Sequence, residues 1–113
     1  MDIFDSSMTI LEKSLDVRSA QQRIVASNLA NIDTPGYVAQ KLDFETSLAN
    51  ALKEEPGPLV VNPSSEPALA LDGNNVNLED ELSDMSRNRM MYSVTAQILA
   101  AKLRQLSTVI SGQ

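Results

Sequence analysis

Apolar residues recur every three or four positions at both ends of the chain, which predicts two long amphipathic helices. The first line comprises Phe4, Met8, Leu11, Leu15, Arg18, Gln22, Val25, Leu29 and Ile32. A second line of Ile3, Ile10, Val17 and Ile24 lies about one residue's rotation away. Because one partner helix covers only one face, the two lines together predict more than one packing partner.

The last third of the chain has the longest regular pattern. It comprises Leu78, Leu82, Met85, Arg89, Tyr92, Ala96, Leu99, Leu103, Leu106 and Ile110. Asn77 with Asp80 resembles a capping box, and Gly112 is a typical C-terminal stop. About 34 residues predict a helix of roughly 51 Å. Further apolar residues lie off this seam, namely Met90, Met91, Val94, Ile98 and Val109.

The middle of the chain predicts a turn, a short element and a linker. Pro35 and Gly36 suit a type II turn over residues 34–37, and the preceding helix is expected to stop by about Asp33. Residues 41–52 fit a short helix or a fold-back segment. Residues 53–75 hold four of the five prolines, which predicts an exposed loop, mobile unless a neighbour holds it.

These elements predict an all-α fold in one structural unit. The long N- and C-terminal helices pair as an antiparallel coiled-coil-like hairpin, with the short helix or fold-back and the extended Pro-rich loop between them. The expected segments are an N-terminal axial helix at 1–33, a turn and short helical segment at 34–53, an exposed Pro-rich linker at 54–76 and a C-terminal axial helix at 77–113.

Charge and composition exclude several functions. The net charge is −6, and residues 33–76 hold seven acids against two bases, so nucleic acid is not an expected partner. The chain lacks histidine and cysteine, and its acidic clusters lie in a loop or on a first helical turn. We therefore predict no enzyme, no metal and no cofactor. The acidic start predicts no cleaved signal, and no apolar run is long enough for a transmembrane segment.

The uncovered apolar lines leave two architectures open. Either neighbouring chains bury them, or residues 41–52 complete a self-contained bundle. Arg18, Gln22 and Arg89 interrupt the seams. They either set register or partner choice, or simply extend to solvent from the seam edge.

Two segments carry a family resemblance. The first is Asn28-Leu29-Ala30-Asn31-Ile32-Asp33-Thr34-Pro35-Gly36-Tyr37 with the later Asp43-Phe44, and the second runs from Asn74 through the C-terminal helix. Both resemble the bacterial flagellar axial proteins, and among them the basal-body rod proteins. The motif residues are Asn28, Ala30, Asn31, Thr34, Pro35, Gly36 and Tyr37. The expected packing seam comprises Leu11, Leu15, Val25, Leu29, Leu82, Met85, Tyr92, Leu99, Leu103, Leu106 and Ile110.

The resemblance implies a structural subunit of a periplasmic rod, built with other copies of itself and other rod subunits. It also implies contact with a rod-to-ring adaptor and a membrane ring protein. Export would use the flagellar type III apparatus, and Phe4 and Met8 are either export-gate contacts or seam residues. The alternatives are another small proximal-rod subunit and, from a different class, a soluble cytosolic helical adaptor.

Overall fold

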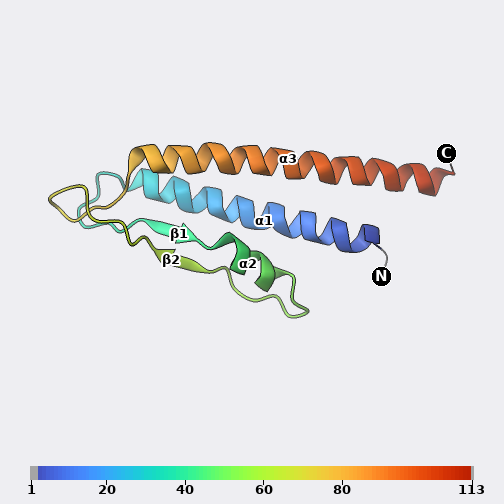
Figure 1. Ribbon diagram of the computed structural model, residues 1–113, viewed down its shortest axis with the longest axis horizontal. Coiled ribbons are helices and arrows are strands. Elements are labelled where there is room, and N and C mark those ends of the chain that lie inside the picture. Colours follow the sequence, from blue (N-terminus) through green and yellow to red (C-terminus); the bar gives the residue numbers. More distant parts are fainter. Residues whose placement is uncertain (1–2, 113) are drawn as a thin grey trace.

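The structure, a computed structural model, describes residues 3–112, with side chains from residue 6 onward. Its elements in order are α1 (Ile3–Ala30), β1 (Gln40–Leu42), α2 (Phe44–Ala51), β2 (Val61–Pro63) and α3 (Leu78–Ser111). In Figure 1, α1 runs antiparallel to α3 and has β1, β2 and α2 along its other side. The molecule is therefore a mostly helical, three-layered rod.

Its shape is elongated. The principal extents are 65 × 28 × 16 Å and the radius of gyration is 17.9 Å, against about 13 Å for a compact domain of 100 residues. The molecule is elongated because its two long helices, of 28 and 34 residues, lie side by side along its length.

The all-α expectation is wrong in one respect, because β1 and β2 form a two-stranded antiparallel sheet. Lys41 pairs with Asn62, and the pairing is extended by bonds from Ser64 N to Ala39 O at 2.7 Å and from Asp43 N to Val60 O at 2.9 Å. The strands are three residues each and their partners lie about twenty positions apart, so a search for local periodicity does not detect them. Between them, α2 is the short helix expected within residues 41–52.

The turn after α1 is confirmed. The helix ends at Ala30, Tyr37 N donates to Thr34 O at 3.2 Å, and Gly36 has a φ of 71°. Glycine meets that positive φ without the steric cost a Cβ brings. The predicted ends of α3 are also confirmed, since Asn77 accepts the Asp80 N–H and Gly112 has a φ of 76°.

The Pro-rich linker is exposed but hydrogen-bonded to the rest of the chain. The Ser47 hydroxyl of α2 accepts the Val60 N–H at 2.8 Å. The Asn50 side chain donates to Pro58 O at 3.1 Å, and Gly57 N donates to Asn50 O at 3.0 Å. These bonds hold residues 57–60 against α2, whereas the sequence predicts a loop that is mobile unless a neighbour holds it.

The interior is small and unusually polar. Its buried apolar residues are Val17, Ala20, Val25, Ala39 and Val76, and its buried polar ones are Asn28, Ser47, Asn74, Asn75, Glu81 and Asn88. Because buried polar groups cost free energy unless they are hydrogen-bonded, these polar residues must be matched to partners.

We expect Ser47→Ala to destabilise the layer formed by β1, β2 and α2. The substitution leaves the Val60 N–H without an acceptor, which costs about 1–3 kcal/mol. Amide hydrogen exchange checks it, with faster exchange expected at residues 59–63. Ser65→Ala, at an exposed serine of the same linker, is the control, and equal exchange in both variants would contradict the prediction.

Candidate assembly interface

The carboxamide of Asn28 joins three elements at the end of α1. Its Oδ1 accepts the Gln40 backbone N–H at 2.9 Å and the Tyr37 hydroxyl at 3.2 Å. Its Nδ2 donates to Gln40 O at 2.8 Å and to both carboxylate oxygens of Glu81 at 3.1 Å. Asn28 is buried, with 1% of its surface exposed. Its amide makes the two hydrogen bonds to Gln40 that a neighbouring strand would make, and it also binds Glu81 at the start of α3.

A second carboxamide, that of Asn74, closes the turn after α1. Its Nδ2 donates to three backbone oxygens, those of Asn31 at 2.9 Å, Ile32 at 3.1 Å and Thr34 at 2.8 Å. Its Oδ1 accepts the Val76 N–H at 2.8 Å. Because the last carbonyls of a helix and its turn lack intrahelical partners, Asn74 supplies the donors that they need.

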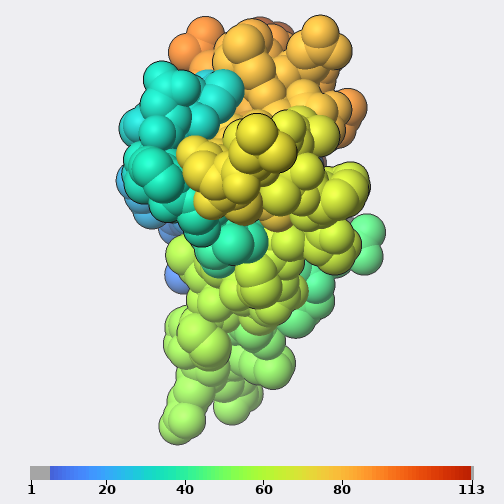
Figure 2. All heavy atoms as spheres, turned by 90° about the vertical axis from the view of Figure 1, so that its left-hand side faces the viewer, coloured from blue at the N-terminus to red at the C-terminus, as the bar shows by residue number. Residues whose placement is uncertain are grey.

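Asn75 does the same for the segment between the turn and β1. Its Oδ1 accepts the Ala39 N–H at 2.7 Å, and its Nδ2 donates to Glu66 O at 3.0 Å. In Figure 2 the segments before β1 (teal) and before α3 (yellow) are packed together against the start of α3. Three side-chain amides thus fix this end of the molecule.

Glu81 is a buried carboxylate, 2% exposed, on the first turn of α3. Burial raises its pKa, while the hydrogen bond from Asn28 and the charge of Lys41 act in the opposite direction. Asp84 and Asp80 raise the pKa further by repulsion. Lys41 itself forms an exposed ion pair with Asp84 at 3.2 Å, so no cation pairs directly with Glu81 among the described residues.

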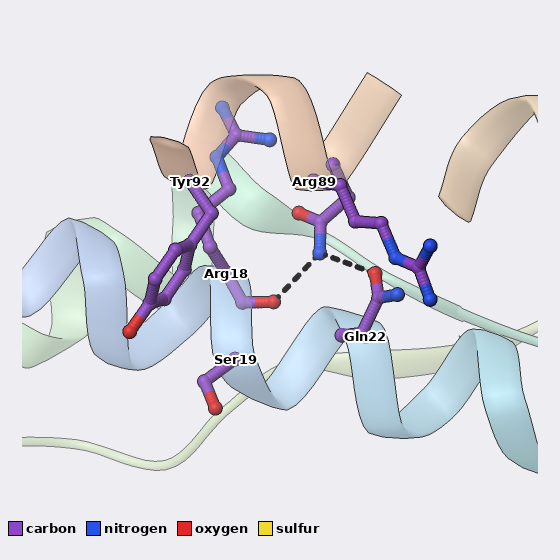
Figure 3. Close-up of a pocket in the computed structure, with 6 residues that line it drawn as sticks. Arg18, Ser19, Gln22, Arg89 and Tyr92 are labelled. Carbon is purple, nitrogen blue, oxygen red and sulfur yellow. Dashed lines mark hydrogen bonds between the residues drawn. The ribbon is translucent and has the colours of Figure 1, made fainter. Parts of the chain in front are cut away.

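Asn88 links the middles of the two long helices. Its Nδ2 donates to Arg18 O at 2.8 Å and to Gln22 Oε1 at 2.9 Å, as the dashed lines in Figure 3 show. The Arg18 guanidinium lies over the Phe44 ring, 3.8 Å from its centroid. Burial lowers the pKa of the Arg18 guanidinium, and the group remains charged at neutral pH.

A cavity of about 330 Å³ opens beside this link. Its walls are Arg18, Ser19 and Gln22 from α1 and Asn88, Arg89 and Tyr92 from α3 (Figure 3). The three residues that interrupt the apolar seams therefore meet at one place.

Two apolar rows of α3 are exposed. The seam row comprises Leu78, Leu82, Tyr92, Leu103 and Ile110, and the off-seam row comprises Met91, Val94, Ile98 and Val109. At 100° per residue, the rows lie on opposite sides of the face that Glu81 and Asn88 turn to α1. Every residue of both rows is at least 39% exposed, so α1 covers neither row.

The other expected seam residues are buried or half-buried. Val25 is buried, and the half-buried ones are Leu11, Leu15, Leu29, Met85, Leu99 and Leu106. Of the motif, Asn28 is buried, Asn31 and Tyr37 are half-buried, and Ala30, Thr34, Pro35 and Gly36 are exposed. Met8 is half-buried, and the Phe4 side chain lies outside the described residues.

Asn74, Asn75, Glu81 and Asn88 were not among the expected site residues. Glu81 and Asn88 are seven residues apart, so they lie on the same face of α3. Each of them directly precedes a residue of the expected seam, Leu82 and Arg89 respectively. That spacing was a usable signal, but a polar pair at heptad spacing is more often solvent-exposed than buried.

Within residues 3–112 the structure shows no group of three or more acidic side chains arranged to hold a metal ion. No helix in that range is apolar over enough of its length to cross a membrane. The amide-linked helices and the two exposed apolar rows are features of a structural protein.

Comparison with known proteins specifies that class. Residues 14–37 match the family described as Flagella basal body rod protein. The chain is 31% identical to flagellar basal body rod protein FlgB of Borrelia hermsii over 97% of this chain and 99% of the relative. It is 28% identical to FlgB of Salmonella typhimurium, over 99% of this chain and 98% of the relative. FlgB of Bacillus subtilis is 27% identical, with the same two coverages.

The chain therefore belongs to the FlgB family, and it is a structural subunit of the bacterial flagellar basal-body rod. The resemblance to rod proteins noted in the sequence is confirmed. The match spans nearly the whole chain.

We expect Asn28→Asp to destabilise the chain strongly. The substitution keeps the acceptor for Gln40 N but removes both donors and places a second carboxylate against Glu81. Losing a hydrogen bond to a charged group costs about 1.5–3 kcal/mol, and repulsion between the two carboxylates adds to that loss. Chemical denaturation measures the loss. Adding Glu81→Gln restores a donor and is expected to recover part of it, and no recovery would contradict the direct contact.

Glu81→Gln alone is expected to change the pH dependence of stability. A raised folded-state pKa means that the favourable contribution of Glu81 is full below its unfolded value of about 4.5 and is lost as pH rises through the folded value. The variant should therefore lose less stability than the parent between pH 4.5 and 8. Thermal unfolding across that range checks the prediction, with the exposed Glu79→Gln as control.

Proposed function

We propose that this rod subunit packs helically against neighbouring subunits and connects the membrane ring to the rest of the drive shaft. The observation that carries the proposal is the pair of exposed apolar rows on α3. Each Leu, Ile or Met that moves from water into an interface contributes about 1.5–3 kcal/mol when fully buried. Rows of such residues on a charged, elongated chain are the surface that a subunit interface requires.

The positions of the rows favour open growth. They lie on opposite sides of α3, so one subunit has two different surfaces to offer. Heterologous contacts between different surfaces produce helical assemblies when the rotation does not close. In this proposal α1 and α3 form a coiled-coil-like hairpin, and their remaining apolar rows contact neighbouring subunits. The turn and short helical segment at 34–53 and the linker at 54–76 connect the two helices.

The family supports the wider setting. The expected partners are copies of the chain, other rod subunits, the rod-to-ring adaptor and the ring protein. The expected location is the periplasmic part of the basal body, reached through the flagellar type III apparatus. Within the N-terminal segment, Phe4 and Met8 remain the candidates for contact with the export gate.

We expect Leu103→Glu to block entry into the rod while leaving the monomer folded. Leu103 is 47% exposed, so the monomer loses little, whereas an interface would have to bury a carboxylate without a partner. Motility and the amount of the chain in purified basal bodies are the measurements, with circular dichroism as the check on folding. Gln97→Glu adds the same charge at an exposed polar position of α3 and should leave both unchanged.

Wild-type motility and incorporation of Leu103→Glu would count against an interface at the seam row. Equal loss in both variants would point to a general effect of added charge, which also contradicts the proposal.

A further inference from the structure

We propose that the cavity between α1 and α3 receives a side-chain carboxamide from a second copy of the chain, an inference that rests on the proposed rod packing. The proposal begins with Asn88, whose Oδ1 is shielded from water and has no hydrogen-bond partner. Asn28, Asn74 and Asn75, the other buried asparagines of the described residues, use both ends of their amides. Asn88 is therefore half-satisfied in the isolated chain.

A buried acceptor without a donor costs free energy, so a state that supplies a donor is favoured. Asn88 lines the cavity, and its residue is 3% exposed. Arg89 and Tyr92, which also line it, are exposed side chains. They are free to move aside and admit a group from outside.

The lining groups select the chemistry of that group. Asn88 Oδ1 needs a donor, whereas the Arg89 guanidinium, the Tyr92 hydroxyl and Gln22 Nε2 are donors without a partner in the described part of the chain. A carboxylate offers no donor to Oδ1, and an ammonium group is repelled by Arg89. A carboxamide supplies a donor and an acceptor in one planar group.

The chain carries suitable groups itself. Asn62 on β2 and Gln105 on α3 are exposed, and neither side-chain amide has a hydrogen bond within residues 6–112. The cavity also adjoins the seam row, since Tyr92 belongs to both. A second copy that packs on this row thus brings its own amides to the cavity mouth.

Cross-linking tests the proposal in assembled basal bodies. The chain has no cysteine, so Ser19→Cys at the cavity can be combined with either Asn62→Cys or Gln105→Cys and treated with a short bismaleimide. We expect one of the two pairs to yield covalently joined copies. Ser86→Cys, at an exposed serine of α3 outside the cavity, replaces Ser19→Cys in the control and should yield none.

The chemistry is tested with Asn62→Asp and Gln105→Glu, which keep the shape but remove the donor. For the residue that cross-links, we expect incorporation into basal bodies to fall about tenfold, as for one lost hydrogen bond to a buried group. Ser65→Asp is the charge control for the first. In addition, Ser19→Met, which fills the cavity, should lower incorporation, whereas Ser86→Met should not.

Basal bodies that contain the chain without a cross-link from position 19 would overturn the inference and leave the proposed function standing. So would wild-type or higher incorporation of both carboxylate variants, since the second result indicates a carboxylate-binding cavity. Absence of the unmodified chain from basal bodies would overturn both the inference and the proposed function.

Discussion

The structure depends on one buried amide, that of Asn28. Its position requires a group that donates and accepts at once, since it faces the N–H and the carbonyl of Gln40 together with the Glu81 carboxylate. Leucine would leave these groups unpaired, and aspartate would oppose two of them. Through these bonds Asn28 fixes the position of β1 and of the first turn of α3 relative to α1. One side chain thus joins the layers on both sides of α1.

The rest of the interior also depends on hydrogen-bonded amides more than on large apolar side chains. The buried apolar residues are small, which lets the layers approach closely but limits the area that the chain removes from water. Directed hydrogen bonds from Asn74, Asn75 and Asn88 make up for the missing bulk by specifying a single arrangement. The larger apolar side chains, Leu103 and Ile98 among them, are left on the outside of α3. The monomer is thus built for a defined shape, and its hydrophobic surface is available to an assembly.

Local signals made the helices predictable. Heptad spacing, the Asn77 cap and the Pro35-Gly36 turn act within a few residues, and each is present in the structure as expected. The strand pairing was not predictable, because Lys41 and Asn62 meet only through tertiary structure. The face of α3 that packs against α1 was not predictable from the sequence either. Periodicity defines apolar rows, but the row that faces α1 is decided by Glu81 and Asn88, whose partners lie more than fifty residues away.

That separation has a consequence for the order of folding. Until residues 74–88 have been synthesised, the turn after α1 lacks the Asn74 amide, Asn28 lacks Glu81 and Arg18 lacks Asn88. In a chain that stops at residue 70, α1, β1 and β2 lack all of these contacts. Since contacts of large sequence separation form late and an isolated helix is marginal, the molecule acquires its tertiary structure only near the end of its synthesis. Because the buried amides contact residues far away in the sequence, a chain that is unfinished or partly extended has no fixed tertiary structure.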